Sequence, residues 1–282
     1  MLIIGNRTFN GNRPLIMGIL NITPDSFYDG GYYNNLESAV VHALEMVAEG
    51  ADIIDIGGES SRPGAKQVTV DEEIARIVPV IEILMNRASV PVSVDTCKAM
   101  VASRAVEAGA CIVNDITALR FDPDMVRVIR ESGCSVVLMH MLGDPQTMQA
   151  DPHYENAFDE ILAFLKERVA FAVDNGISKD KIIVDPGIGF GKTLEHNLQI
   201  LRNIRRFHET GCSVLMGVSR KSMIGKITGA PVEERLWGTA AITAYGVMEG
   251  IEIHRVHDVK AMRQVCDVAS ALRLNSSLVP GE

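Results

Sequence analysis

Eight short apolar runs, each followed by an amphipathic stretch, constrain the fold of this chain more than any other feature. The runs recur at intervals of about 20 to 45 residues and are LIMGILNI (15–22), DIIDIGG (52–58), VPVSVDT (90–96), CIVNDI (111–116), SVVLMH (135–140), KIIVDPG (181–187), SVLMGV (213–218) and IEIHRVH (251–257). Continuous apolar runs, unlike alternating ones, are typical of strands that are covered on both faces. The runs therefore predict a parallel sheet.

Helices are predicted between these strands because apolar residues return there at helical spacing. In the first stretch, Val40, Ala43, Leu44 and Val47 form one stripe. The predicted helices cover 36–50, 71–86, 100–110, 123–133, 156–176, 194–207, 233–250 and 259–273. Eight strand–helix units predict a single (β/α)8 TIM barrel, and a doubly wound sheet is the alternative.

No linker or shift in composition divides the chain, so one barrel domain is expected over residues 1–282. A barrel of this kind typically has about 250 residues. Residues 1–14 contain FNGNRP, a hairpin-like turn, and are expected to plug the bottom of the barrel. Residues 274–282, which end in SSLVPGE (276–282), are expected to be a disordered tail.

Charge and cysteine content exclude several classes of protein. The chain has 27 Lys and Arg against 36 Asp and Glu, a net charge of −9, which argues against nucleic-acid and anionic-membrane partners. No run approaches the roughly 20 apolar residues of a membrane helix. The N-terminus lacks a leader pattern, and the five cysteines show no metal-type or CxxC spacing. We expect free thiols and a cytoplasmic protein.

Polar residues gather where the predicted strands end, which is where barrels of this type carry their function. They are Asn21, Asp55 with Glu59, Asp95, Asn114 with Asp115, His140, Asp185, Lys221, and Arg255 with His257. Carboxylates accept paired N–H bonds and an amide both donates and accepts, so Asp95, Asn114 and Asp185 suit a flat heterocycle. Each aspartate alone also suits a helix cap, and the sequence leaves both readings open.

A second group of residues indicates a small anion. Basic side chains in an acidic chain imply an anion held by specific contacts, and here they are Arg62, Arg220, Lys221, Arg255 and His257. The segment VSRKSMIG (218–225) also places Ser219 and Ser222 at a predicted helix start, which is an anion-binding feature. The long loops 23–35 and 59–70 are either lids over this site or surface decoration.

Seven motifs together resemble the dihydropteroate synthases of folate biosynthesis. They are NITPDSF (21–27), GGESSRPGA (57–65), VSVDT (92–96), VNDI (113–116), VDPGIGFGKT (184–193), GVSRKSMIG (217–225) and HRVHDV (254–259), in the family's order from about residue 14 to residue 273. The resemblance implies a TIM-barrel transferase that joins 6-hydroxymethyl-7,8-dihydropterin diphosphate to 4-aminobenzoate. It further implies bound Mg2+, a homodimer, and sulfonamides that compete with aminobenzoate.

Matched motif by motif, the resemblance also implies roles for individual residues. The pterin ring would be held by Asp95, Asn114, Asp185 and Lys221, and the diphosphate by Arg62, Arg255, His257 and Asn21, with Asn21 also a Mg2+ ligand. The aminobenzoate would lie against Ser61, Pro63 and Phe190, with its carboxylate near Ser222, and Phe27 would close over the site. Asp95, Lys221 and Arg255 are the expected catalytic residues. Ser61 departs from the threonine usual in the family.

Two other functions compete with this one. A methyltetrahydrofolate-binding domain of a cobalamin-dependent methyltransferase would share the pterin carboxylates but needs no diphosphate clamp, so Arg62, Arg255 and SRKS argue against it. A catalytically silent pterin-binding paralogue would have lost some of Asn21, Asp95, Asp185, Lys221 and Arg255, and all five are present. The apolar excess on helices 233–250 and 259–273 fits either a dimer interface or packing between helices.

Overall fold

Eight parallel strands close into a barrel in this protein, whose computed structural model describes residues 1–11, 13–22, 32–60, 67–144 and 147–273. The strands are β3 (Leu15–Asn21), β4 (Ile53–Gly57), β5 (Val92–Asp95), β6 (Ile112–Asp115), β7 (Ser135–Met139), β8 (Ile182–Asp185), β9 (Ser213–Gly217) and β10 (Ile253–Val256). They pair in chain order, and β10 pairs with both β9 and β3. This closure confirms the predicted barrel and excludes the doubly wound sheet.

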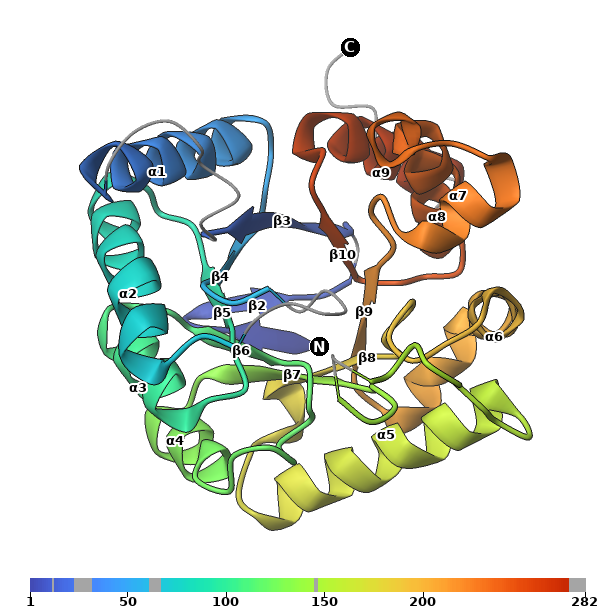
Figure 1. Ribbon diagram of the computed structural model, residues 1–282, viewed down its shortest axis with the longest axis horizontal. Helices are drawn as coiled ribbons and strands as arrows, with labels where there is room; N and C mark the ends of the chain where they lie inside the picture. The colour runs from blue at the N-terminus through green and yellow to red at the C-terminus, as the bar shows by residue number, and fades with distance from the viewer. Residues whose placement is uncertain (12, 23–31, 61–66, 145–146, 274–282) are drawn as a thin grey trace.

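Helices surround the barrel as a ring (Figure 1). They are α1 (Tyr32–Ala48), α2 (Val70–Arg87), α3 (Ala99–Glu107), α4 (Met125–Ser132), α5 (Ala157–Asp174), α6 (Leu194–Arg202), α7 (Ser222–Thr228), α8 (Leu236–Met248) and α9 (Val259–Arg273), with short 3-10 turns η2 (Lys179–Lys181), η3 (Ile204–Thr210) and η4 (Val232–Glu234). The predicted helices 194–207 and 233–250 were too long, because a 3-10 turn occupies one end of each.

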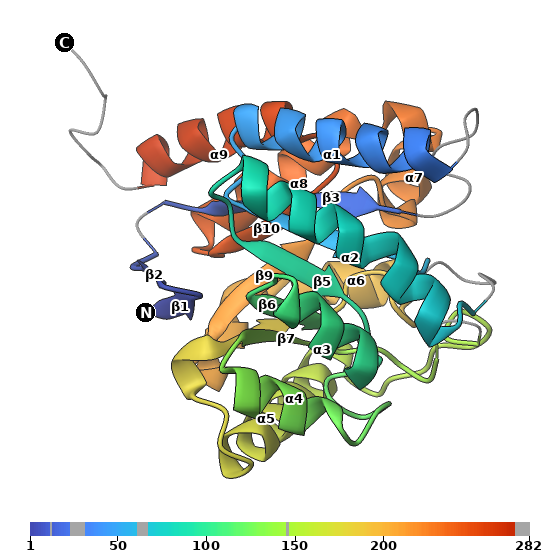
Figure 2. The same ribbon diagram turned by 90° about the vertical axis from the view of Figure 1, so that its left-hand side faces the viewer.

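A hairpin of β1 (Leu2–Ile4) and β2 (Arg7–Phe9) covers the N-terminal end of the barrel. Leu2 and Ile4 pack against the lowest layer of side chains inside the barrel. Figure 2 shows this hairpin at the end opposite α7. The predicted plug is therefore confirmed, but its turn was misplaced. The turn lies at Gly5 and Asn6, where Gly5 has a φ of +57°, and not within 9–14. The tail at 274–282 lies outside the described residues.

The side chains inside the barrel change from apolar to polar along each strand. Ile53, Ile112, Ile183 and Ile253 belong to the apolar layer that contacts the hairpin. Residues two positions apart point to the same side of a strand. The next inward residues, at the C-terminal ends of the same strands, are Asp55, Asn114, Asp185 and Arg255. The hairpin thus closes one end of the barrel, and polar groups collect at the other.

The outward faces of the strands form the main core with the surrounding helices. Val94, Val113 and Val184 belong to this apolar layer. His254 is also fully buried, and its ring lies near Gly246 of α8, so it points away from Arg255, in line with the alternation of side chains along a strand. Within the described part of the chain, no helix is long and apolar enough to cross a membrane.

Candidate active site

Arg255 lies at the centre of the polar end of the barrel and joins two carboxylates. Its Nε donates to Asp55 Oδ2 at 2.6 Å, and its Nη2 donates to Asp95 Oδ2 at 2.7 Å. Asn114 Nδ2 donates to the same Asp55 oxygen at 3.2 Å. The structure thus brings together the predicted residues Asp95, Asn114 and Arg255 through a shared partner.

The shared partner is Asp55, a residue at a strand end for which the sequence predicted no specific role. Asp55 is fully buried, and within the described residues its Oδ1 has no hydrogen-bond partner. A signal was available in the sequence, since Asp55 has the same inward position near the C-terminal end of β4 that Asn114 and Asp185 have on β6 and β8. What the sequence did not show is that Arg255 reaches across from β10.

Burial and neighbouring charges set the protonation of this cluster. Burial raises the pKa of Asp95 to about 7, although the charge of Arg255 acts to lower it, and the nearby Asp55 carboxylate raises it further. Burial acts to lower the pKa of Arg255, but Asp55 and Asp95 together hold it above its ordinary value. Arg255 is therefore cationic, while Asp95 changes charge near neutral pH.

Asp185 and Lys221 form the second part of the site. Asp185 Oδ1 accepts a hydrogen bond from the backbone N–H of Gly187 at 2.7 Å. Burial raises the pKa of Asp185, and burial lowers the pKa of Lys221 to about 8 against the attraction of Asp185. Lys221 Nζ donates to the carbonyl of Ile188 and lies 4.7 Å from the centre of the Phe190 ring.

The helix-cap alternative does not hold for either aspartate. Asp95 binds Arg255, and the first turn of α3 is instead held by Asp122, which accepts from the N–H of Ala99 at 2.8 Å. Asp185 binds the turn that follows its own strand. That turn needs a glycine at 187, because φ there is +67° and a Cβ would lie 1.9 Å from the carbonyl oxygen of His140.

The predicted anion-binding residues separate into two groups. His257 binds the hydroxyl of Ser219, and Ser222 is the exposed first residue of α7. Both lie on the same side of the barrel as Arg255. Arg220 differs from the prediction, because its guanidinium pairs with Asp258, with Nε 2.9 Å from Oδ2. This ion pair joins the loop after β9 to the loop after β10.

Asn21, the predicted metal ligand, ends β3 next to Asp95. Its Oδ1 would lie 3.6 Å from a Cβ placed on Gly57, and the Asp95 Cβ lies 3.5 Å from the same point, so the glycine makes room for both side chains. No side-chain hydrogen bond of Asn21 is formed among the described residues. These residues also contain no cluster of three or more His, Cys, Asp or Glu side chains suited to a metal.

Four predicted site residues, Phe27, Ser61, Arg62 and Pro63, lie outside the described residues. Two other polar residues at strand ends have structural partners. Glu59 pairs with Lys98 at 2.6 Å. His140 Nδ1 lies 3.0 Å from Lys192 Nζ, and burial lowers the pKa of His140 to about 2. His140 is therefore a neutral, buried residue.

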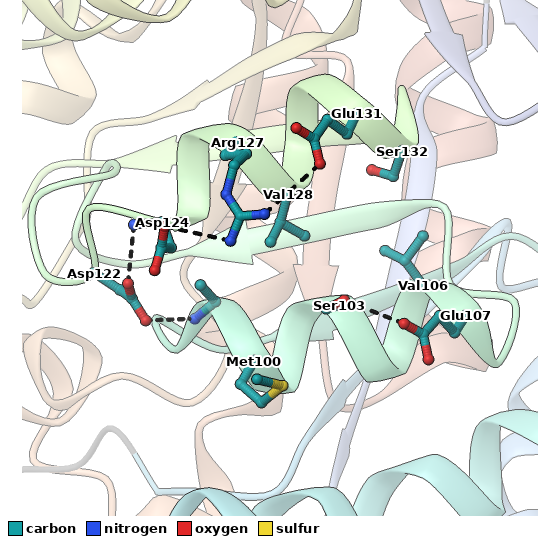
Figure 3. A pocket seen from close by; sticks show the side chains of 11 residues that line it. Met100, Ser103, Val106, Glu107, Asp122, Asp124, Arg127, Val128, Glu131 and Ser132 are labelled. Carbon is teal, nitrogen blue, oxygen red and sulfur yellow. Dashed lines mark hydrogen bonds and ion pairs between the residues drawn. The ribbon is translucent and has the colours of Figure 1, made fainter.

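A separate hollow of about 360 Å³ lies between α3 and α4 (Figure 3). Several of its charged side chains contact one another or other lining residues. Arg127 contacts Asp124 at 3.4 Å and Glu131 at 3.8 Å, and Ser103 donates to Glu107. None of its lining residues belongs to the polar cluster inside the barrel. The hollow is therefore separate from the polar cluster at the barrel mouth.

Comparisons with known proteins agree with this geometry. The family model for pterin binding enzymes matches residues 17–257, the span that contains every described residue of the cluster. A dihydropteroate synthase of Clostridium beijerinckii is 48% identical over 258 residues, which cover 91% of this chain and 93% of the relative. The chain belongs to the dihydropteroate synthase family. It is accordingly a transferase of folate biosynthesis.

Solved dihydropteroate synthase structures share the fold along nearly the whole chain. The Yersinia pestis enzyme with a sulfonamide drug complex has a TM-score of 0.91 at 43% identity, covering 96% of this chain and 98% of that one. The Xanthomonas albilineans enzyme in complex with 7,8-dihydropteroate has a TM-score of 0.86 at 41% identity, covering 95% and 97%. The likeness thus extends to enzymes captured with an inhibitor and with the product.

Proposed function

We propose that this dihydropteroate synthase joins 6-hydroxymethyl-7,8-dihydropterin diphosphate to 4-aminobenzoate at the mouth of the barrel, releasing diphosphate and 7,8-dihydropteroate. The observation that carries the proposal is the convergence of Asp95, Asn114, Asp185 and Arg255 at the ends of four strands. A cation beside two carboxylates and an amide suits a substrate that combines a polar heterocycle with an anion. A methyl-transferring pterin enzyme would not need the anion-binding side of this site.

The pterin ring is bound by Asp95, Asn114, Asp185 and Lys221. Carboxylates accept from the ring N–H groups, the Asn114 amide both donates and accepts, and the Lys221 ammonium donates to the ring carbonyl. Burial supports this role, because hydrogen bonds to a planar heterocycle are stronger where water is excluded. Gly217 leaves space for the Arg255 and Lys221 side chains, which lie 3.8 and 4.0 Å from the position of its missing Cβ.

Arg255, His257, Arg62 and Asn21 bind the diphosphate. Asn21 also fits a Mg2+ ion, since it ends β3 and its side chain forms no hydrogen bond among the described residues. Mg2+ is commonly held by one or two protein oxygens, waters and substrate phosphates. Bound there, Mg2+ would supply positive charge that stabilises the leaving diphosphate. The Asn21→Ala variant should need a higher Mg2+ concentration for half-maximal activity. An unchanged Mg2+ requirement would remove Asn21 from the metal site.

The reaction is a largely dissociative substitution. The bond from the pterin methylene to the diphosphate oxygen breaks with its electron pair leaving on diphosphate, and Arg255 stabilises that anion. Asp95 stabilises the positive charge on the dihydropterin. The neutral amine of aminobenzoate then forms the C–N bond and releases one proton. Asp95→Asn should therefore lower kcat by about 100-fold, the size of one lost electrostatic contact, while pterin binding is retained.

Aminobenzoate occupies the outer part of the mouth, against Phe190, Ser61 and Pro63, with Phe27 closing over it and its carboxylate near Ser222. Phe190 is supported for this role by its partly buried ring, which packs beside Met139 and Met141. Sulfonamides compete for the same place. In this scheme the apolar wall orients the aryl ring, and the polar start of α7 receives the carboxylate.

A coupled diphosphate-release assay tests the proposal directly. The protein is supplied with dihydropterin diphosphate, Mg2+ and 4-aminobenzoate, with and without a sulfonamide. Release that requires aminobenzoate and is suppressed by the sulfonamide supports the synthase. Tight pterin binding without release would instead indicate a silent pterin-binding protein.

The assembly is a homodimer formed through α8 and α9, and the compartment is the cytoplasm. On these helices Trp237, Leu272 and Val268 are 79%, 71% and 63% exposed, which makes them candidates for an interface between protomers. Ala240 and Val247 pack inward, so only part of the apolar excess of α8 serves the core. All five cysteines are free thiols, which supports a reducing compartment.

A further inference from the structure

Ser219, in the loop between β9 and α7, holds His257, which follows β10. Ser219 is 6% exposed, and its Oγ lies 3.1 Å from the backbone nitrogen of His257 and 3.0 Å from the ring nitrogen Nδ1. One hydroxyl thus contacts both the backbone and the ring of the same histidine. This double contact fixes where the imidazole lies.

A second tie between the same two loops keeps Ser219 in place. Arg220 has a left-handed backbone with a φ of 56°, which is uncommon outside glycine. Its N–H donates to Thr239 Oγ1 at 3.0 Å, and its guanidinium pairs with Asp258, the residue after His257. The geometry of the Ser219–His257 contact is therefore set by the surrounding fold.

The donors and acceptors around Ser219 Oγ determine which ring nitrogen of His257 carries the proton. A serine hydroxyl has one proton and two acceptor sites. Because the His257 backbone N–H can only donate, Oγ accepts there. If Oγ also accepted from Nδ1–H, the buried hydroxyl proton would have no acceptor, since among the described residues Ser219 Oγ forms no other hydrogen bond. An unsatisfied buried donor is costly, so the hydroxyl donates to an unprotonated Nδ1.

We infer that Ser219 is a positioning residue that fixes neutral His257 as the tautomer with its proton on Nε2, so that the ring presents a donor to an anionic oxygen at the barrel mouth. The identity of that oxygen, on the departing diphosphate, rests on the proposed function. The tautomer is a property of the free protein. A donor at Nε2 binds phosphate oxygens, whereas an unprotonated Nε2 would repel them.

Nitrogen NMR of ring-labelled histidine tests the tautomer in the free protein at a pH where His257 is neutral. The His257 signals are assigned by their loss in His257→Asn. We expect the proton on Nε2 and an acceptor-type Nδ1 in the wild type, with both shifts moving toward averaged values in Ser219→Ala and staying in place in Ser219→Thr. A proton on Nδ1 in the wild type overturns the inference.

Kinetics test whether Ser219 acts through His257. Ser219→Ala should lower kcat/KM for dihydropterin diphosphate about fivefold, the effect of one hydrogen bond, and should have no further effect in the His257→Asn background. Ser135→Ala is the matched control, because it removes a buried serine hydroxyl that binds the Ile3 carbonyl at the opposite end of the barrel. It should leave kcat/KM unchanged.

An equal loss for Ser219→Ala in both backgrounds contradicts a role through His257. These experiments distinguish the tautomer of His257 from the proposed function of the site. If the wild type carries its proton on Nε2 but releases no diphosphate, the tautomer assignment stands and the proposed function fails. If diphosphate is released and the proton lies on Nδ1, the function stands and the inference about Ser219 fails.

Discussion

Arg255 on β10 reaches across two intervening strands to place its Nη2 2.7 Å from Asp95 Oδ2 on β5. On the way its Nε binds Asp55 on β4. Three strands are therefore tied together by one guanidinium at the level where the substrate is proposed to bind. The arrangement fixes Arg255 in one direction before any substrate arrives, which lowers the reorganisation needed during the reaction.

Asp55→Asn should lower kcat/KM for dihydropterin diphosphate by about 10- to 100-fold, because the amide removes one of the two charges that orient Arg255. Breaking one side of a buried ion pair should also cost about 3 kcal/mol of unfolding free energy. Steady-state kinetics and denaturant unfolding measure the two effects separately.

The control for this variant is Asp52→Asn. Asp52 accepts from Arg263 at 3.1 Å and from the Ile16 N–H at 2.8 Å, at the other end of the barrel. It should lose stability and keep kcat/KM. If Asp55→Asn kept wild-type kcat/KM as well, Asp55 would serve only the fold.

The pH dependence of catalysis should show an acid limb near pH 7 and a loss of activity above about pH 8. Asp95, whose pKa is about 7, must lose its proton to stabilise a cation, and Lys221, whose pKa is about 8, must keep its proton to remain charged. A kcat/KM profile for dihydropterin diphosphate measures both limbs. Asp95→Asn should remove the acid limb and Lys221→Gln the basic limb. An acid limb that survives in Asp95→Asn belongs to another group.

Loss of the Asp95 proton should raise catalytic activity but lower the stability of the folded protein. The folded pKa of about 7 lies above the ordinary value of 3.8, so the folded protein binds this proton more tightly than the unfolded chain. The contribution of Asp95 to stability therefore falls as pH rises from about 4 to 7. Unfolding free energies across this range should show Asp95→Asn gaining on the wild type as pH increases. A constant difference would mean that Asp95 has an ordinary pKa.

The sequence was sufficient to predict the barrel because each apolar run is a strand that is buried on both faces. Polar residues also mark the C-terminal end of each run. The predicted strands agree with the structure to within two residues. The hairpin turn at Gly5 was missed because FNGNRP contains more turn residues. Asp55 was given no role, and Ser219 was predicted only at an anion-binding helix start, because their contacts with Arg255 on β10 and with His257 just after β10 join residues distant in the sequence. Contacts of this kind depend on barrel closure, which no local pattern encodes.

Charged substitutions on the exposed face of α8 and α9 should disrupt the proposed homodimer. Trp237→Glu together with Leu272→Glu places two charges on side chains that are 79% and 71% exposed, and a charge in an apolar interface is strongly unfavourable. Sedimentation velocity should change from dimer to monomer. The control is Met100→Glu with Phe121→Glu, a pair 59% and 58% exposed on the other side of the barrel, which should stay dimeric. A wild-type protein that sediments as a monomer would contradict the proposal.

Ser61→Thr should strengthen sulfonamide inhibition modestly. The resemblance of the motif GGESSRPGA to the family leads us to expect threonine at this position, and Ser61 belongs to the aminobenzoate group of the proposed site. One added methyl contributes at most about 0.8 kcal/mol of apolar contact, which corresponds to about a fourfold lower inhibition constant. The hydroxyl is retained, so kcat should not change. Inhibition constants for wild type and variant, measured against the same sulfonamide, decide the matter. Equal constants would show that the methyl at position 61 does not contact the inhibitor.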